Sequence, residues 1–140
     1  MHTKNICAMI VSSLLLTSPC VPAATAQPPS VASEQPNPQR ISVQMQGSGP
    51  DVILIPGLAS SRDIWAGLAA DLRQRHRVHL VELAGFASTP AISSPDGKVL
   101  APAVDAIAEY IRTRHINAPA IIGHSLGGEI ALMLAARHPD

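Results

Sequence analysis

The stretch that decides the fold is residues 120–131, Ala120-Ile121-Ile122-Gly123-His124-Ser125-Leu126-Gly127-Gly128-Glu129-Ile130-Ala131. A short apolar run leads into Gly-x-Ser-x-Gly, and an apolar pattern with helical spacing follows at once. This order predicts a strand and a helix joined by a sharp turn, with Ser125 at its apex. Side chains two positions before and after the serine would collide in such a turn, so Gly123 and Gly127 supply the missing bulk.

Ser125 is the candidate nucleophile, because a turn of this kind lifts a serine hydroxyl clear of the sheet. Serine is a weak nucleophile by itself and needs a base that is oriented by a third group. The serine could instead cap the helix that starts at Leu126, since serine is a favoured N-cap residue. A cap does not require a glycine on each side, so the pattern favours the nucleophile.

Residues 1–26 have the pattern of a secretory signal peptide. Lys4 supplies the positive charge, residues 6–16 form the apolar core, and residues 24–26 (Ala-Thr-Ala) fit the small-x-small cleavage site. We therefore expect an exported protein, periplasmic or secreted, whose mature chain starts at Gln27. The apolar run is too short to span a bilayer as a helix.

Two other interpretations of this segment are weaker. One is a buried N-terminal helix, and the other is a lipoprotein attachment at Cys20, which is disfavoured by the preceding Pro19. Cys7 and Cys20 both precede the expected cleavage site, so the mature chain would contain no thiol or disulfide.

The charged residues indicate neither a nucleic-acid partner nor another charged partner. Ten basic residues balance ten acidic ones, without a basic cluster or an acidic tail. No Cys/His spacing and no helical His pair predicts a metal site. We therefore expect no nucleic acid, no metal and no stable membrane span, with the oligomeric state left open.

After a proline-rich segment at 27–40, which indicates an extended and disordered tether, the pattern alternates between strands and helices. Strict alternation and buried apolar runs predict strands, and apolar residues at helical spacing predict helices. The expected elements are strands at 41–46, 52–55, 78–83 and 118–122, and helices from Ser60 or Ser61 to about 75, at 103–114 and at 126–138, with a loop at 84–97. Such an order predicts an α/β fold with a mostly parallel sheet and helices on both faces.

With these elements in order, the sequence resembles the α/β-hydrolase superfamily from about residue 41 to residue 140, which matches the N-terminal half of the family's domain. The first marker is the apolar strand with its His-Gly-like turn, Val52-Ile53-Leu54-Ile55-Pro56-Gly57-Leu58. The second is Glu82-Leu83-Ala84-Gly85-Phe86-Ala87-Ser88, similar to the family's Asp-x-x-Gly-x-Gly-x-Ser. The third marker is the nucleophile elbow, Gly123-His124-Ser125-Leu126-Gly127. Pro56 departs from the histidine that is common in the family.

The resemblance implies an oxyanion hole made by two backbone N–H groups, those of Leu58 and Leu126. The N–H of Leu126 also lies at a helix N-terminus, which favours developing negative charge. The implied activity is cleavage of an ester, amide or related bond in a small-molecule substrate through an acyl-Ser125 intermediate, without a metal or an organic cofactor. Acyltransferase or cofactor-free haloperoxidase-like chemistry is the alternative within the same fold.

The family's triad acid and histidine follow the nucleophile in chain order. After Ser125 only three such residues remain, Glu129, His138 and Asp140, and the first two lie on the elbow helix itself. His124 adjoins the serine but is expected to pack rather than act as a base. We therefore expect neither the triad acid nor the triad histidine in this chain.

The domain organisation expected from these observations is a signal peptide (1–26), a tether (27–40) and the N-terminal part of an α/β-hydrolase domain (41–140), truncated after the elbow helix. Such a fragment would leave the strand at 118–122 as an unpaired apolar edge, which favours aggregation. We expect this chain by itself to be inactive and poorly soluble. A binding protein without turnover is the alternative. Glu82, in the acidic place of the second marker, is expected to order a loop.

Overall fold

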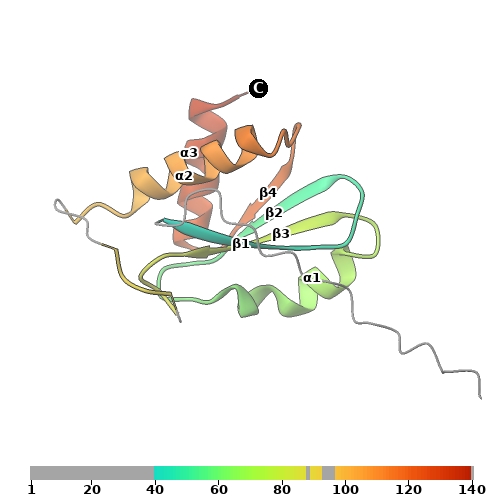
Figure 1. The fold of residues 1–140 in the computed structure, drawn as a ribbon, viewed down its shortest axis with the longest axis horizontal. Coiled ribbons are helices and arrows are strands. Elements are labelled where there is room, and N and C mark those ends of the chain that lie inside the picture. The colour runs from blue at the N-terminus through green and yellow to red at the C-terminus, as the bar shows by residue number, and fades with distance from the viewer. Residues whose placement is uncertain (1–39, 88, 93–96, 140) are drawn as a thin grey trace, which may run out of the picture.

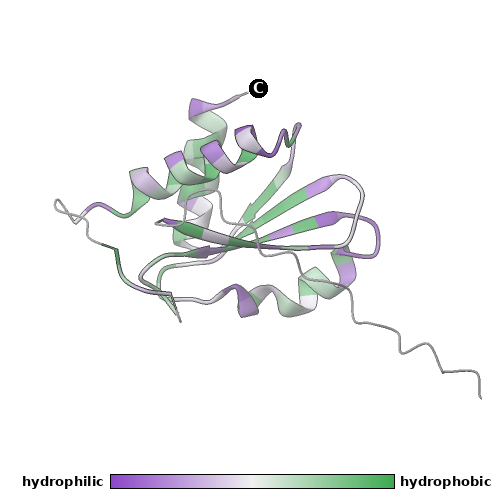
Figure 2. Cartoon of the chain, viewed as in Figure 1, coloured by the Kyte–Doolittle hydropathy of each residue, from purple (hydrophilic) through white to green (hydrophobic). Residues whose placement is uncertain are grey.

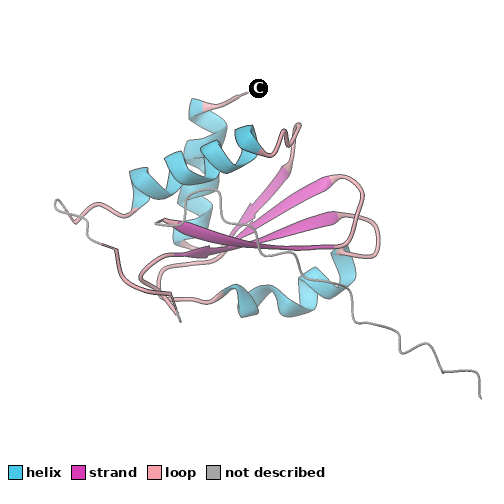
Figure 3. Cartoon of the chain, viewed as in Figure 1, coloured by secondary structure: helices cyan, strands magenta, loops and turns pink. Residues whose placement is uncertain are grey.

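A computed structural model describes residues 40–87, 89–92 and 97–139 of the chain. The predicted signal peptide and all of the tether except Arg40 lie outside the described residues. Figure 3 shows the helices and strands of the described part of the chain. The elements are β1 (Ile41–Gln46), β2 (Asp51–Ile55), a 3-10 turn η1 (Arg62–Trp65), α1 (Ala66–Leu72), β3 (Arg77–Leu83), α2 (Leu100–Thr113), β4 (Ala120–Gly123) and α3 (Leu126–Arg137). The predicted order of strands and helices is confirmed.

The four described strands form one mixed, mostly parallel sheet in the order β1-β3-β2-β4. β2 runs parallel to both β3 and β4, and β1 runs antiparallel to β3. Helices α2 and α3 cover one face of this sheet and α1 covers the other (Figure 1). The predicted α/β architecture is therefore confirmed, with β1 as its antiparallel element.

β1 and β2 are consecutive but not adjacent, because β3 lies between them. The turn that joins them passes against the connection from α1 to β3. A Cβ on Gly47 would lie 2.4 Å from the carbonyl oxygens of Arg73 and His76, and one on Gly49 would lie 2.4 Å from that of Arg75. Both glycines also have a positive φ, 75° and 118°. Only glycine allows so close a crossing in this conformation.

The core has two parts, one on each face of the sheet. On the first face, Ile53, Ile55 and Val81 pack against α2 and α3, where Ile107 and Ile130 are fully buried. On the second face, a smaller set packs under α1; its buried members are Val52, Leu54, Ala69, Val78 and Leu80. Figure 2 shows the apolar residues concentrated along the strands. Burying both faces of β2 explains its continuous apolar run.

Three predicted boundaries were wrong. The predicted cap of the first helix is confirmed, because the Ser61 hydroxyl accepts from the N–H of Asp63. This helix begins as a 3-10 turn, however, and its α-helical part ends at Leu72 rather than at about residue 75. α2 starts three residues earlier than expected because Pro102 lies in its first turn, where a missing N–H costs nothing. The last strand starts at Ala120 rather than at residue 118.

β4 lies at an edge of the described sheet and pairs with β2 alone. Its Ile122 points to the face that α1 covers elsewhere, and this side chain remains 37% exposed. In the part of the chain that the structure describes, no helix has the length and apolar content needed to cross a bilayer.

Candidate functional site

The parallel strands β2 and β4 end at the same edge of the sheet. Ile55 pairs with Gly123, and the N–H of His124 donates to the carbonyl of Ile55 at 3.0 Å, which extends the ladder one residue beyond β4. The turns that follow the two strands therefore leave the sheet side by side. In open α/β sheets, ligands bind at this carboxyl edge.

Ser125 occupies the sharp turn between β4 and α3 and is exposed to solvent. Its backbone has φ 52° and ψ −117°, a conformation that is strained for any residue with a Cβ. An ordinary N-cap has extended dihedrals and a capping side chain. The hydroxyl of Ser125 makes no capping hydrogen bond, so the geometry is that of an elbow rather than of a cap.

The two flanking glycines are required by direct backbone contacts. A Cβ on Gly123 would lie 2.1 Å from the carbonyl oxygen of Gly127. A Cβ on Gly127 would lie 2.2 Å from the carbonyl oxygen of Ile55 and 2.7 Å from that of Pro56. The sequence predicted that side chains at these two positions would collide. In the structure, such side chains would meet backbone atoms, those of the turn for position 123 and those at the end of β2 for position 127.

The loop after β2 lies directly against the elbow. A Cβ on Gly57 would come within 3.3 Å of the Cβ of Ser125 and 2.9 Å of His124 Nδ1. The N–H of Ser60 donates to the carbonyl of Gly57 at 3.2 Å and closes a tight turn, with Ala59 at φ 57° and Leu58 at the tip. The Leu58 side chain is 55% exposed.

The two backbone N–H groups predicted to form the oxyanion hole are both available. Within the described residues, neither Leu58 nor Leu126 donates a backbone hydrogen bond through its N–H. Leu126 is the first residue of α3, whose first turn leaves its N–H groups without partners inside the helix. The structure brings both loops beside Ser125, while the roles of Leu58 and Leu126 stay predictions.

No candidate base among the described residues pairs with Ser125. The His124 ring lies against Gly57 and makes no hydrogen bond to the serine. Glu129 is exposed in the first turn of α3, and His138 caps its other end. A helix of 12 residues is about 18 Å long, which puts His138 far from the elbow. Asp140 lies outside the described residues.

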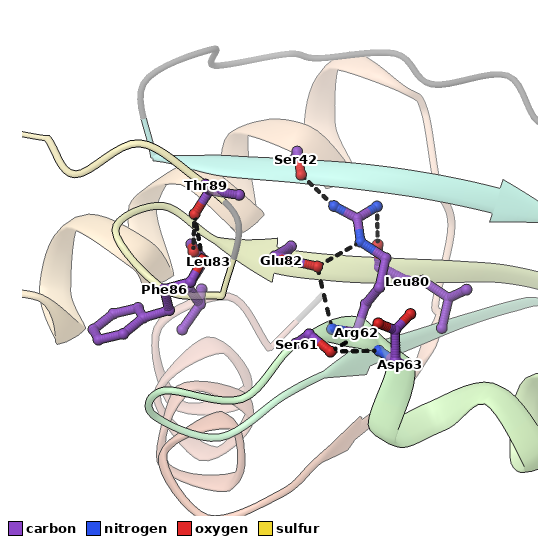
Figure 4. A network of polar contacts seen from close by, with 9 residues as sticks. All are labelled: Ser42, Ser61, Arg62, Asp63, Leu80, Glu82, Leu83, Phe86 and Thr89. Carbon is purple, nitrogen blue, oxygen red and sulfur yellow. Dashed lines mark hydrogen bonds and ion pairs between the residues drawn. The ribbon is translucent and has the colours of Figure 1, made fainter.

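Glu82 anchors the start of the helix that follows the Leu58 loop (Figure 4). It is 6% exposed near the end of β3, and its Oε2 accepts from the backbone N–H of Arg62 at 3.2 Å and from the Nε of Arg62 at 2.7 Å. The same guanidinium contacts the Ser42 hydroxyl and, at 3.5 Å, the carbonyl of Leu80. The sequence indicated that Glu82 orders a loop, but not which one.

A second set of buried polar side chains joins the amino-terminal ends of β2 and β3 to α2. His79, 1% exposed, contacts Asp51 through Nε2 at 2.7 Å and the Tyr110 hydroxyl through Nδ1 at 2.6 Å. Burial lowers the pKa of His79, whereas the hydrogen bond from Arg77 lowers the pKa of Asp51. The imidazole is therefore neutral at neutral pH.

Sequence reasoning missed this second set because its members are far apart along the chain, 28 residues for His79 and Asp51. The one available signal was a histidine in the middle of an apolar strand. Asp51 and His79 lie four residues before the ends of β2 and β3. At roughly 3.3 Å per residue, this puts them about 13 Å from the edge of the sheet where the elbow lies. The set therefore stabilises the fold rather than forming part of the candidate site.

A hollow of about 150 Å³ lies beyond the end of β3, and Ser125 does not line it. Its wall includes Leu83, Phe86 and Ala103. Among the described residues, no cluster of three or more His, Cys, Asp and Glu side chains could hold a metal ion.

Comparison with known proteins identifies a family match and several similar proteins. Residues 50–140 match the family described as alpha/beta hydrolase fold. A pimeloyl-[acyl-carrier protein] methyl ester esterase of Chromobacterium violaceum is 39% identical over 99 residues, which are 70% of this chain and 36% of that protein. The structure of a bacterial membrane phospholipase A is 31% identical with a TM-score of 0.66, over 79% of this chain and 36% of that one.

The similarity in fold extends to proteins of lower sequence identity. An epoxide hydrolase of Vigna radiata is 20% identical and superimposes with a TM-score of 0.69, over 79% of this chain and 36% of that chain. The present chain spans about a third of the length of the curated relatives it matches.

Proposed function

The chain belongs to the alpha/beta-hydrolase fold family, and on that premise we propose that the whole protein is a serine hydrolase that cleaves carboxylic esters through an acyl-Ser125 intermediate. Among the relatives, a methyl ester esterase and a phospholipase A support an ester substrate. The proposal concerns the whole protein because the described residues supply the nucleophile and its surroundings but no base.

In the proposed reaction, Ser125 Oγ attacks the ester carbonyl carbon while its proton passes to a general base. The tetrahedral oxyanion accepts hydrogen bonds from the N–H groups of Leu58 and Leu126. Collapse expels the alcohol, which takes up the proton, and water then attacks the acyl-serine to release the acid and free Ser125. Both N–H donors stabilise charge that exists only at the tetrahedral stage, so they raise kcat rather than affinity.

One observation carries the proposal. Ser125 is held in a strained backbone conformation, exposed, with its hydroxyl unused in any capping bond, and Gly57 lies against it. A protein retains such strain where the surrounding contacts enforce it, and strained residues cluster at functional sites. The close approach of Gly57 to Ser125 supports the proposal that the Leu58 loop supplies the second oxyanion donor.

A fluorophosphonate probe tests the proposed nucleophile. We expect the probe to phosphonylate the natural full-length protein on Ser125, because the reaction needs an activated serine and mimics the tetrahedral stage. Peptide mass spectrometry would identify the labelled residue. Ser60 and Ser61, which lie in the nearby loop, serve as internal controls and should stay unlabelled. Absence of label, or label on these loop serines, would contradict the proposal.

Removing one backbone N–H tests the oxyanion hole. Leucic acid in place of Leu126 turns the N–H into an ester oxygen and keeps the side chain. We expect kcat for p-nitrophenyl butyrate to fall by about 10²–10³-fold with little change in KM, as on loss of one oxyanion donor. Steady-state kinetics of the semisynthetic protein would measure this effect.

The matched control is lactic acid in place of Ala101. That residue lies in the first turn of α2, and its N–H likewise donates no backbone hydrogen bond within the described residues. Both ester replacements also weaken the preceding carbonyl as an acceptor, so only the position of the lost N–H differs. Equal effects of the two replacements on kcat would show that Leu126 is not a donor in the reaction.

A further inference from the structure

We propose that Glu82 is a positioning residue for the same reaction, acting through Arg62 to fix the loop that carries the N–H of Leu58. The inference rests on the proposed function, because it assigns Leu58 to the oxyanion hole. Its structural basis is the network of Figure 4, which ties the end of that loop to β1 and β3.

The loop from β2 to η1 is held at two points. Its first residues are fixed by the elbow, where Gly127 packs against the carbonyls of Ile55 and Pro56, and Gly57 packs against Ser125. Its far end is fixed where the backbone N–H of Arg62 donates to Glu82. Only residues 59–61 separate Leu58 from Arg62, so we expect a shift at Arg62 to move Leu58.

Between the two anchors, residues 57–60 form a tight turn in which the backbone of Ala59 is strained. The N–H of Ser60 closes the turn onto Gly57, and Ala59 adopts φ 57°, which an alanine leaves readily when the ends are released. The Leu58 side chain is exposed and provides little packing to resist such a change. The orientation of the Leu58 N–H therefore depends on the anchors.

The anchor at Arg62 is strong because its ion pair with Glu82 is largely removed from solvent and because the guanidinium has a second partner in Ser42. Glu82 is buried, and the side chain of Arg62 is only 19% exposed. Charge-assisted hydrogen bonds in such surroundings are stronger than neutral ones. Ser42 and Glu82 are directly paired on neighbouring strands, so the guanidinium is oriented by β1 as well as by β3. The rigid sheet thereby sets the position of the loop.

The test compares Glu82→Gln, Glu82→Asp and Glu109→Gln in the natural full-length protein, with p-nitrophenyl butyrate as the substrate. Glu109→Gln is the matched control, because it breaks a Glu–Arg ion pair on the exposed side of α2. We expect Glu82→Gln to lower kcat by about 10–100-fold and to change KM less than about twofold, since a misplacement near 1 Å can cost 10²-fold. Glu82→Asp keeps the charge and should recover most of kcat.

The inference is overturned if Glu82→Gln leaves kcat at the level of Glu109→Gln, or if KM rises in step with a fall in kcat. Absence of Ser125-dependent turnover in the wild type would instead refute the proposed function. That failure is distinguishable, because the loop can also be observed without catalysis.

Amide hydrogen exchange provides this second readout, and it also covers a Glu82 variant that fails to fold. Ser42→Ala removes one contact of the Arg62 guanidinium and leaves Glu82 bound to the Arg62 backbone. We expect exchange in residues 57–62 to accelerate by about threefold to tenfold, with α2 unchanged, because loss of the contact loosens the anchor locally. Unchanged exchange in 57–62, or equal acceleration in α2, would overturn the inference.

Discussion

Replacing Ser125 by alanine is expected to lower the kcat of the whole protein for p-nitrophenyl butyrate on the order of 10⁶-fold, the loss typical of a removed serine nucleophile. Without Oγ no acyl-enzyme forms, and only the oxyanion donors and substrate binding continue to act. Alanine keeps the Cβ, so the strain at φ 52° and the contacts of Gly57 with the elbow are unchanged. The melting temperature should therefore match that of the wild type.

Two further substitutions make the result specific. Ser61→Ala removes a loop hydroxyl that caps η1 and should leave kcat within about threefold of the wild type. Loss of the cap costs about 1 kcal/mol of stability, but it leaves the bonds between Arg62 and Glu82 in place and removes no reacting atom. Ser125→Gly should be as inactive as Ser125→Ala but more stable than it, because glycine tolerates a positive φ. A Ser125→Ala protein that retained a tenth or so of wild-type kcat would refute the acyl-serine mechanism.

The sequence predicted the elbow and the order of the elements because both are local. Gly-x-Ser-x-Gly between an apolar run and a helical pattern is typical of one local structure, a sharp turn from a strand into a helix. The close backbone contacts of Gly123 and Gly127 explain why this turn needs glycine at both positions. The continuous apolar run at 52–55 predicted burial on both faces, and these four residues are all buried. Helix ends were less predictable, since the start of α2 depends on Pro102 being harmless in a first turn.

What the sequence could not predict depends on pairing between distant segments. The insertion of β3 between β1 and β2 joins Ser42 to Glu82, and only then can Arg62 reach both. Likewise, Asp51 and Tyr110 meet His79 only when β2, β3 and α2 are docked. Each of these side chains, taken alone, is typical of a solvated or packing residue. The network that positions the Leu58 loop is therefore a property of the register of the sheet.

Gly127→Ala is expected to destabilise the fold strongly. The new Cβ would lie 2.2 Å from the carbonyl oxygen of Ile55 and 2.7 Å from that of Pro56, so it meets backbone rather than a side chain that could move aside. Relief requires α3 to separate from β2, which exposes part of the larger core around Ile130. We expect a loss of about 4 kcal/mol or more in the free energy of unfolding, an exceptional value for one methyl group. Urea denaturation of the whole protein would measure it.

Gly128 provides the matched control, because it is the next residue in the same helical turn. A Cβ there would lie 3.6 Å from the nearest neighbour, the carbonyl oxygen of Gly123, which is an ordinary contact. Alanine is the better helix former by about 1 kcal/mol, so Gly128→Ala should raise the free energy of unfolding by roughly 0.5–1 kcal/mol. A lower free energy of unfolding for Gly127→Ala and a higher one for Gly128→Ala would show that Gly127 is needed for the close contact between α3 and β2, and not for helix flexibility. Losses of similar size at both positions would contradict that explanation of the elbow.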